Sequence, residues 1–582
     1  MNPFSELEGA VRTGLADLVA AGELPAGLDL GRVTVEPPRD AGFGDAATNA
    51  AMLLARPAGR KPMELAASLA RALAGRGDIV SAEAAPPGFV NLRMRPAFWQ
   101  RYALAALAAG PDWGRSEVGQ GIGINVEYCS ANPTGPLHVG HGRGTVFGDA
   151  LANLLAKAGY EVTREYYVND GGAQIETLAR SLHLRYREAL GEQIGAIPEG
   201  LYPGDYLVPV AKQIVERDGA RWHNLPEAEW LGAFSRIAVE AMLALIRADL
   251  AALGAHHDLF VSERSLIEGG RVDEALRVLE ERGLIYRGTL PPPKGKPDDD
   301  WEPREQLLFR ATAFGDDTDR PLKRSSGEWT YFAADIAYHL DKIRRGSDQL
   351  VDVLGADHGG YVKRMQAAVA ALSDGRASME ARVCQLVNLL DGGKPLRMSK
   401  RAGRIVTLRD VVDEVGKDVV RFIMLTRKND APLDFDLVKV TEQSKDNPVF
   451  YVQYAHARIR SVFRNLAETA QAGLAVDLWS ADLAPLAEPE EMALLREVAF
   501  FPRLVEAAAQ HREPHRVAFY LNGLAGSFHG LWTRGNERPE LRFLQPDAPA
   551  LTRARLAMLE AVRVTLAAGL AILGVEPVEE LR

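Results

Sequence analysis

The sequence predicts an α/β protein whose central domain is built on a parallel sheet, with an N-terminal α+β module and a C-terminal all-helical domain. Three observations support this fold class. Residues 121–170 alternate strand, helix and strand, which is the βαβ pattern of parallel strands joined by a right-handed crossover. Residues 1–112 mix helical and strand-like segments. From residue 441 onward, apolar side chains recur at the i, i+3, i+4 spacing of helices.

The composition of the 582-residue chain is that of an ordinary globular protein, with 47% apolar and 25% charged residues. Its length indicates about three or four domains. The two cysteines, Cys129 and Cys384, argue against a disulfide framework and a cysteine-rich zinc site, and they fit a reducing cytoplasm. The sequence does not begin with a signal-peptide layout, and no continuous apolar run reaches the length of a membrane span. We therefore expect no membrane partner.

The N-terminal module is placed at residues 1–112, because the turn-forming residues Pro111 to Gly114 follow it. Periodic apolar spacing marks its helices, and Pro and Gly bound its strands. The predicted elements are helices over 5–22 and 45–59 and strands over 33–38 and 88–94.

The central domain is placed at residues 113–440 and the helical domain at 441–582. Residues 171 to about 290 are polar and mostly helical, which is too long for a crossover. Together with a Pro/Asp-rich loop, they are predicted to form an insertion at about 171–300. The other elements expected in this domain are strand 121–128, helix 141–159, strand 161–170 and strand 349–355.

A phosphate-binding site is predicted just after the first strand of the central domain. His138 and His141 follow a Pro/Gly loop at the start of a helical pattern, where the i, i+3 spacing puts both on one face. A helix N-terminus and imidazole N–H groups can both donate to phosphate oxygens. Gly140, Gly142 and Gly144 would let a nucleotide approach the backbone. A zinc pair or two surface histidines are the alternatives, but zinc needs further ligands and none is evident nearby.

A second basic loop, RMSKRAG from Arg397 to Gly403, suits the same chemistry. Lys400 would be a mobile cation for the β- and γ-phosphates, Ser399 suits a flexible loop, and Met398 would pack inward. HVGH and RMSK resemble the two signatures of class I aminoacyl-tRNA synthetases, in the order of that class. Arg397 replaces the first lysine of the family pattern, which keeps the charge but not the geometry of the contact.

The resemblance narrows to the arginyl-tRNA synthetase family and covers almost the whole chain. It implies a Rossmann-like catalytic domain that joins arginine to ATP, giving arginyl-adenylate and pyrophosphate, and then charges the 3′-terminal ribose of tRNA(Arg). It also implies Mg²⁺ bound with ATP, an N-terminal module at the tRNA elbow and a C-terminal anticodon-binding domain. The matching stretches are VEYCSANPTGPLHVGH (126–141), YPGDY (202–206), WTYFAADIAYHLDK (329–342), GADHGGYVKRM (355–365) and DNPVFYVQYAHARI (446–459).

The resemblance places an arginine site on several segments. Tyr331 and Asp335 lie i, i+4 on a helical segment, so both face one way. The Asp335 carboxylate would accept two parallel N–H bonds from a guanidinium. Without the family match, a packed Tyr331 and a solvated Asp335 would be the simpler interpretation. The other positions matched to arginine are Glu127, Ser130, Asn132, His141 and Gln366, and those matched to ATP are His138, Gly140, His141, His358, Met398, Ser399 and Lys400.

Three residues are matched to tRNA contacts. Asn91 corresponds to a family position that meets a base of the D-loop, and Tyr454 and Arg458 offer stacking and basic groups at the start of the helical domain. An apolar helix core would also use tyrosines, and a basic run such as 456–464 is often a solvated face. The net charge of −10 is a weak objection to RNA, which meets a local patch.

The residues alone leave three alternative functions. Another class I synthetase, such as the cysteine or glutamine enzyme, shares both signatures, although the scarcity of cysteines disfavours the zinc-dependent cysteine enzyme. A small-molecule nucleotidylyltransferase shares HxGH but would not need the C-terminal helices. A synthetase-like RNA-binding regulator would not need His138, His141 and Lys400. We therefore expect a cytoplasmic, monomeric, ATP-dependent ligase whose partners are arginine, ATP and tRNA(Arg).

Overall fold

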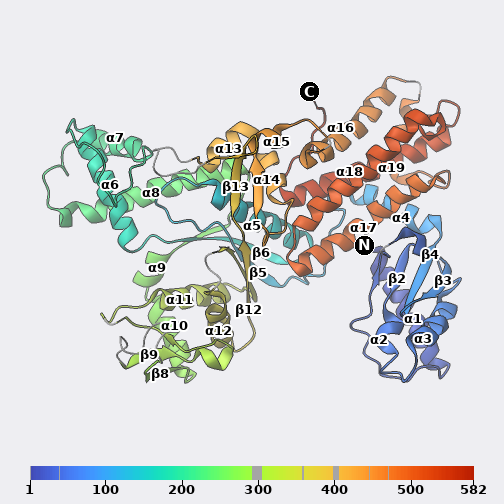
Figure 1. Cartoon of the computed structure of the whole chain (residues 1–582), viewed down its shortest axis with the longest axis horizontal. Helices are drawn as coiled ribbons and strands as arrows, with labels where there is room; N and C mark the ends of the chain where they lie inside the picture. Colours follow the sequence, from blue (N-terminus) through green and yellow to red (C-terminus); the bar gives the residue numbers. More distant parts are fainter. Residues whose placement is uncertain are drawn as a thin grey trace. The chain divides into compact units, whose positions relative to one another are not determined.

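The computed structural model describes residues 2–38, 40–290, 304–324, 326–356, 360–396, 406–444, 446–469 and 471–581. The chain divides into two compact units (Figure 1). The first unit comprises Met1–Ser116, Ser444–Ile572 and Glu576–Arg582, so it joins the N-terminal module to C-terminal helices. The second unit comprises Glu117–Gln443 and Leu573–Val575 and contains the parallel sheet.

The predicted parallel sheet is present in the second unit. Its strands run in the order β12-β11-β5-β6-β7, and every neighbouring pair is parallel. Because β5 lies between β6 and β11, the direction of strand addition reverses beside β5. Ligands of such sheets bind at the carboxyl ends of the strands next to that reversal. The strands are β5 (Gly123–Glu127), β6 (Glu161–Val168), β7 (Leu259–Ser262), β11 (Gln349–Gly355) and β12 (Ser378–Cys384).

Helices bury the apolar strands of this sheet, as parallel sheets require. α5 (Val139–Lys157) follows β5 along the chain. α11 (Tyr331–Arg344) and α12 (Val362–Ser373) share one core with β11 and β12, in which Leu350 and Met365 have no exposed surface. The carboxyl ends of β5 and β11 are therefore held on a rigid base.

The predicted insertion is a helical subdomain with its own core, but it ends earlier than predicted. α6 (Ala173–Ala189), α7 (Leu207–Asp218) and α8 (Glu227–Leu253) pack around the buried side chain of Phe234. The chain then returns to the main sheet as β7, within the stretch predicted to be mostly helical as far as about residue 290. β7 has four residues and all are half-buried. Neither length nor alternation therefore marks this strand in the sequence.

The rest of the second unit adds two small sheets and further helices. β8, β9 and β10 form an antiparallel sheet, while β13 pairs with β14 in antiparallel and with β15 in parallel orientation. In chain order these elements are α9 (Glu263–Glu268), α10 (Arg271–Glu281), β8 (Ile285–Gly288), β9 (Gln306–Phe309), β10 (Arg320–Pro321), β13 (Val387–Asp391), β14 (Lys394–Pro395), α13 (Leu408–Val415), α14 (Lys417–Met424), β15 (Leu433–Asp436) and α15 (Leu437–Thr441).

The buried side chain of Arg421 holds residues Leu573–Val575 in the second unit. Arg421 on α14 is fully buried and forms an ion pair with Asp149 of α5. Its Nε donates to the carbonyl oxygen of Leu573 at 2.8 Å, and its Nη1 donates to that of Gly254 at 3.1 Å. A buried guanidinium needs such acceptors. Residues Leu573–Val575 therefore complete the packing of this unit.

The N-terminal module of the first unit is a four-stranded antiparallel sheet in the order β1-β2-β4-β3. The segment 45–59, predicted as one helix, instead forms β2 and a short helix, α2. Ala46 and Thr48 are small and buried and pair with β4, and Thr48 Oγ1 accepts the N–H of Ala50 where α2 begins. The elements are α1 (Pro3–Ala20), β1 (Val35–Glu36), β2 (Ala46–Thr48), α2 (Ala50–Leu54), α3 (Pro62–Leu73), β3 (Ile79–Ala85), β4 (Phe89–Met94) and α4 (Pro96–Ala109).

The helices predicted from residue 441 are present, and in the first unit α17 packs against α4. One helix in the described part of the chain, α19, is long and apolar enough to span a membrane by length and composition, although charged residues interrupt its apolar side chains. Of its most apolar window, 78% is buried inside the protein, as for a core helix of a soluble protein. The long helices are α16 (Pro448–Ala467), α17 (Pro489–His511), α18 (His515–Glu537) and α19 (Pro549–Leu573).

Candidate functional site

The candidate site lies where β5 ends, beside the point at which the direction of strand addition reverses. β5 ends at Glu127, and the chain then turns through Cys129 and Ser130, whose φ angles of 69° and 40° lie in the left-handed region. Such backbone is costly for residues other than glycine and is concentrated at functional sites. The turn fixes the Ser130 hydroxyl, which donates to Glu127 Oε1 at 3.0 Å and accepts the N–H of Tyr167 at 3.0 Å.

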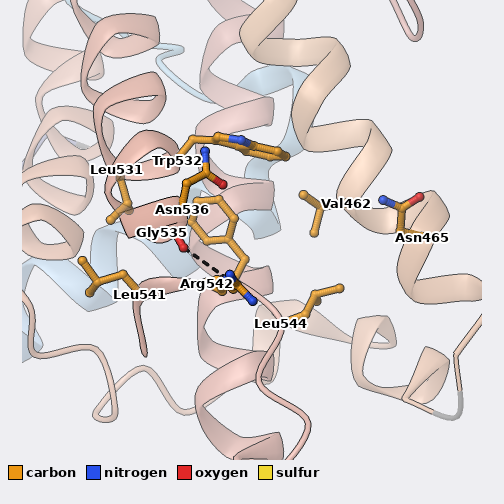
Figure 2. A pocket seen from close by; sticks show the side chains of 10 residues that line it. Val462, Asn465, Leu531, Trp532, Gly535, Asn536, Leu541, Arg542 and Leu544 are labelled. Atoms are coloured by element: carbon orange, nitrogen blue, oxygen red, sulfur yellow. Dashed lines mark hydrogen bonds between the residues drawn. The ribbon is translucent and has the colours of Figure 1, made fainter. Parts of the chain in front are cut away.

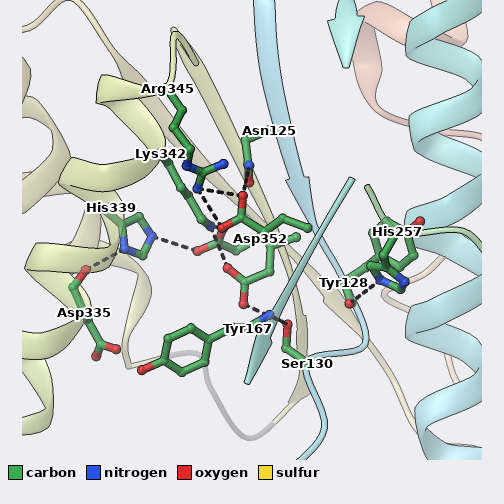
Figure 3. A network of polar contacts seen from close by, with 12 residues as sticks. Asn125, Tyr128, Ser130, Tyr167, His257, Asp335, His339, Lys342, Arg345 and Asp352 are labelled. Carbon is green, nitrogen blue, oxygen red and sulfur yellow. Dashed lines mark hydrogen bonds and ion pairs between the residues drawn. The ribbon is translucent and has the colours of Figure 1, made fainter. Parts of the chain in front are cut away.

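A buried lysine holds the other oxygen of Glu127 (Figure 3). The Lys342 side chain on α11 has no exposed surface, and its Nζ donates to Glu127 Oε2 at 2.6 Å and to Asp352 Oδ1 at 3.0 Å. His339 Nε2 lies 3.1 Å from Asp352 Oδ2. Burial raises the pKa of Glu127, and the Lys342 ammonium opposes that rise. Burial also disfavours the Asp352 carboxylate, but Lys342 and His339 hold its pKa below the usual range.

Asp335 lies two helical turns before Lys342 on α11, so the two residues share a face. Burial raises the pKa of Asp335 to about 7, and the carboxylates of Glu263 and Glu127 add to the rise. The Tyr361 hydroxyl donates a hydrogen bond to Asp335. A half-buried carboxylate with a raised pKa, beside further acids, is a suitable place for a cation.

Tyr331 and Asp335 lie one turn apart on a helix, as predicted, but they differ in exposure. Tyr331 is 65% exposed, whereas Asp335 is half-buried. The guanidinium of Arg324 lies 4.9 Å from the centre of the Tyr331 ring. A Cβ placed on Gly172 would lie 3.9 Å from the Tyr331 hydroxyl. The Tyr331 side chain therefore borders the site on its solvent-exposed side, whereas the Asp335 side chain lies deeper in the protein.

The two histidines of the HVGH motif meet at the start of α5. His138 is the N-cap, and its ring stacks on that of His141 with the ring centres 3.7 Å apart. The His138 N–H donates to His141 Nδ1 at 3.3 Å. Burial, with a contribution from His138, lowers the pKa of His141 to about 4. His141 is therefore neutral near pH 7 and carries its hydrogen on Nε2, where it can donate to an oxygen.

The glycines of this helix have different roles from the one predicted for all of them. Gly140 is exposed, in keeping with close approach of a ligand. Gly142 instead faces protein, because a Cβ there would lie 2.8 Å from Leu408 Cδ1. The prediction that Gly142 clears a path for ATP is therefore wrong, and its small size lets α5 pack. Gly148 allows the closest approach, since its Cβ would lie 2.2 Å from Cβ of Tyr128.

Sequence reasoning missed four charged or titratable residues of this cluster. His339 and Lys342 stand four and seven residues after Asp335, so one face of α11 carries all three, and this spacing is a signal that could have revealed them. Asp352 lies within β11 and reads as part of an apolar strand. Glu263 is buried, its pKa is raised by burial, and Tyr167 donates to it. Glu263 follows β7, a strand that the sequence did not predict. Nothing in the sequence therefore indicated a role for this residue.

The remaining predicted residues of the second unit are not brought into this cluster by any described contact. Asn132 is exposed, in a turn where its carbonyl oxygen accepts the N–H of Thr134 at 2.8 Å. Gln366 is exposed on α12, and its amide donates to the Met379 carbonyl oxygen at 3.2 Å. The described residues contain no group of His, Cys, Asp and Glu arranged to hold a metal. His358, Met398, Ser399 and Lys400 lie outside the described residues.

In the first unit, Trp532 of α18 borders a pocket (Figure 2), and Arg458 of α16 lies near the rings of both Trp532 and Tyr454. The Arg458 guanidinium lies 4.4 Å from the centre of the Tyr454 ring and 4.7 Å from that of Trp532. Trp532 borders a pocket of about 250 Å³. Aromatic faces and side-chain amides of this kind suit an unstacked base. The pocket is lined by Val462, Asn465, Leu531, Trp532, Gly535, Asn536, Leu541, Arg542, Phe543 and Leu544.

Asn91 lies on β4 of the N-terminal module. Its neighbours in the strand, Val90 and Leu92, are buried, whereas Asn91 and Phe89 are half-buried. Because side chains alternate along a strand, Asn91 and Phe89 point together to the opposite face of the sheet. Phe89 is therefore not part of the fully buried core.

The basic run 456–464 on α16 is partly covered by the C-terminal tail. His456 is fully buried, with Nδ1 2.8 Å from the carbonyl oxygen of Val578. Arg460 forms an ion pair with Glu579, and Arg464 Nε lies 3.5 Å from Glu580 Oε1. Two arginines that the sequence offers for phosphate contacts are thus already paired within the unit.

Known proteins resemble this chain along its whole length. Residues 5–94 match the family "Arginyl tRNA synthetase N terminal domain", residues 110–197 match "tRNA synthetases class I (R), catalytic domain", and residues 452–581 match "DALR anticodon binding domain". The chain is 59% identical to the arginine–tRNA ligase of Parvibaculum lavamentivorans and 58% identical to that of Rhodospirillum rubrum, each over 100% of both chains. The Thermus thermophilus arginyl-tRNA synthetase structure shares the fold, with a TM-score of 0.74 at 24% identity over 99% of this chain and 100% of that one.

Proposed function

The chain belongs to the arginyl-tRNA synthetase family and is an ATP-dependent arginine–tRNA ligase, and we propose that the carboxyl ends of β5 and β11 hold its substrates. Asp335 carries this proposal, because it is a half-buried acid with a raised pKa beside Glu127, near the point where the direction of strand addition reverses. The alternative functions fall away, since full-length relatives at 58–59% identity are arginine–tRNA ligases.

Arginine binds with its guanidinium at Asp335 in this proposal. The carboxylate accepts two parallel N–H bonds, and Tyr331 adds a flat wall and a hydroxyl. Glu263 supplies a second buried acid whose charge reaches Asp335, so other guanidinium N–H groups also find an acceptor. A neutral side chain such as that of glutamine or cysteine would leave these acids uncompensated. The residues proposed for the α-amino and carboxylate end are Glu127, Ser130, Asn132, His141 and Gln366.

ATP, with Mg²⁺ on its phosphates, binds at the start of α5 in this proposal. The helix N-terminus and Nε2–H of His141 donate to phosphate oxygens, and exposed Gly140 lets the nucleotide approach. Lys400 supplies a positive charge to the β- and γ-phosphates. His138, His358, Met398 and Ser399 complete the proposed ATP site.

Activation joins a carboxylate oxygen of arginine to the α-phosphorus of ATP. The bond from that phosphorus to the bridging oxygen breaks, and pyrophosphate leaves. Positioning and charge stabilisation do most of the work in such transfers. Neutral His141 can donate to the developing charge without losing a proton. The terminal ribose hydroxyl of tRNA then attacks the carbonyl carbon of the adenylate, and AMP leaves.

The first unit is proposed to bind tRNA(Arg). Asn91 and Phe89 on the outer face of β4 suit a base of the tRNA elbow, and Tyr454, Arg458 and the pocket beside Trp532 suit the anticodon arm. The domain roles follow as elbow binding at 1–112, catalysis at 113–440 with a helical insertion that ends before β7, and anticodon binding at 441–582. We also propose that the enzyme works as a monomer in the cytoplasm, without a membrane partner.

The proposed arginine site is tested with citrulline, which replaces the guanidinium by a neutral group of similar shape. Wild-type enzyme should charge tRNA(Arg) with arginine and reject citrulline. Asp335→Asn should lower kcat/KM for arginine roughly a hundredfold or more, because breaking a buried charge pair costs about 3–5 kcal/mol. ATP binding should persist in the variant. Unchanged discrimination between arginine and citrulline in D335N would refute the assignment of Asp335.

A further inference from the structure

We propose that Lys342 is a positioning residue for arginine binding, which holds Glu127 as a carboxylate in one orientation so that it can receive the substrate's α-ammonium. The inference rests on the proposed role of Glu127 in the arginine site. It concerns a residue that does not touch the substrate. Its ground is the set of contacts that Lys342 makes across three elements of the second unit.

Lys342 makes two hydrogen bonds and one cation–π contact inside the protein. An ammonium has three N–H donors. One is directed to Glu127 Oε2 at 2.6 Å and one to Asp352 Oδ1 at 3.0 Å, while Nζ lies 4.4 Å from the centre of the Tyr338 ring. The side chain has no exposed surface. Lys342 therefore acts on arginine only through the groups that it holds.

The contacts on Glu127 fix its orientation and leave it able to bind. Lys342 holds Oε2, and the Ser130 hydroxyl holds Oε1 at 3.0 Å. Each oxygen of a carboxylate can accept two hydrogen bonds, so one acceptor position on each oxygen is left for a ligand. Ser130 is itself held by the N–H of Tyr167 and by the turn that follows β5. The orientation of the Glu127 carboxylate group is thus fixed before the substrate binds.

The charges around Glu127 show why a cation is needed there. Asp352 faces the same ammonium, and His339 lies with Nδ1 2.8 Å from the Asp335 carbonyl oxygen and Nε2 3.1 Å from Asp352. Without Lys342, burial and the charge of Asp352 would favour a protonated Glu127. The charged and titratable groups that face Glu127 are Lys342, His339, Asp335, Asp352, Tyr167, Tyr338 and Tyr361.

A neutral Glu127 would lose its attraction for the α-ammonium, and this gives the test. Lys342→Met keeps the length of the side chain and removes its charge. At about pH 7 it should raise the arginine KM roughly ten- to hundredfold, the effect of a lost charge-assisted hydrogen bond, with smaller changes in kcat and in the ATP KM. The arginine KM of K342M should then improve as pH rises toward about 9, because the Glu127 carboxyl group ionises at higher pH. A merely structural lysine would not shift this pH profile.

The variant Glu127→Gln tests whether Lys342 acts on arginine binding through the charge of Glu127 or independently of it. E127Q alone should raise the arginine KM, and adding K342M to E127Q should raise it no further, since no carboxyl group at residue 127 is left to ionise. The double variant has the same net charge as the wild-type cluster, so it can be compared even if K342M alone does not fold. Thermal unfolding and ATP binding report folding in each case.

Arg345→Met is the matched control, because Arg345 also lies near the end of α11 and pairs with a buried acid, Glu165, instead of Glu127. R345M should leave the pH profile of the arginine KM in place. A wild-type arginine KM and pH profile in K342M would overturn the proposal. So would independent, multiplying effects of E127Q and K342M, or the failure of both Lys342 variants to fold. A wild-type arginine KM in E127Q would instead refute the role of Glu127 itself.

Discussion

At the residue scale, Asp335 links arginine binding to pH. Burial raises its pKa to about 7, so near neutral pH much of the enzyme carries the protonated form. A guanidinium binds the carboxylate, and binding therefore releases a proton. The affinity for arginine should rise between about pH 6 and pH 8 and level off above, because the raised pKa delays ionisation of this acid. Calorimetry in buffers of different ionisation enthalpy should detect the proton. D335N should give a weaker and flatter profile, and a flat wild-type profile would contradict the prediction.

His141 should act as a neutral donor. Its pKa of about 4, lowered by burial and by His138, leaves it uncharged through the physiological range. Its Nδ1 already accepts the His138 N–H, so Nε2 is the donor. His141→Ala should slow single-turnover adenylate formation by about 10²–10³, the effect of losing one preorganised donor. His141→Gln, whose amide is also a neutral donor, should recover part of that rate. Equal rates in the two variants would exclude a donor role.

The motifs in the sequence predict only some of the residues of the site. HVGH and the Tyr331/Asp335 pair are local patterns, and the structure places them on α5 and α11 as predicted. The partner of Glu127 could not be predicted in this way, because Lys342 lies 215 residues away along the chain and meets it only after the sheet has formed. A lysine in an apolar helix gives no sign of which acid it will face.

At the element scale, the packing of α5 on the end of β5 depends on one glycine. A Cβ on Gly148 would lie 2.2 Å from Tyr128 Cβ, and both groups are buried. Gly148→Ala should therefore destabilise the protein by about 1–3 kcal/mol or more, since overpacking forces backbone shifts. Gly144→Ala is the control on the same helix, because its nearest neighbour would be 3.9 Å away. It should be neutral or stabilising by about 0.5–1 kcal/mol. Urea unfolding of the two variants tests the difference.

The tail on α16 should weaken tRNA binding. Glu579 and Glu580 pair with Arg460 and Arg464, which then have less charge to offer phosphates. E579Q/E580Q should bind tRNA more tightly and show a steeper salt dependence, by about 0.7–0.9 in log–log slope for each additional phosphate that the freed arginines neutralise. Neutralising two exposed acids elsewhere in the first unit, Glu468 and Glu537, is the control for net charge. An equal slope in E579Q/E580Q and wild type would show that the pairs do not compete with tRNA.

The long C-terminal helices were predicted from the sequence, whereas the short strands β2 and β7 were not. α16 to α19 each carry many turns of apolar spacing, and all were expected from the sequence. β7 and β2 have four and three residues, and their membership of a sheet depends on distant partners, β6 and β4. A pattern of period 2 cannot show itself over so few residues.

At the scale of the whole molecule, cutting the chain before the helical domain should do more than remove tRNA contacts. Leu573–Val575 belong to the second unit, and Arg421 donates to the Leu573 carbonyl oxygen. A chain stopped near Asn447 should therefore lose arginine charging and also leave this buried guanidinium short of an acceptor. A sharper comparison is a chain ending at Ile572 against one ending at Val575, since both lack the tail from Glu576. The shorter chain should be less stable by about 1–3 kcal/mol. Equal stability would show that this late segment is dispensable.

The hydrogen bond between Arg421 and Leu573 can form only late in the synthesis of the chain. The ribosome adds Leu573 152 residues after Arg421. At about 5–20 residues per second, the acceptor of Arg421 is therefore synthesised roughly 8–30 s after Arg421 itself. The parallel sheet can assemble during that interval, but the helix that begins with the HVGH histidines is anchored through Asp149 to an arginine whose surroundings are still incomplete. A chain released early by a premature stop would carry both signature motifs and yet expose an unfinished core. Proteases and chaperones that sample nascent chains would meet it before any substrate did.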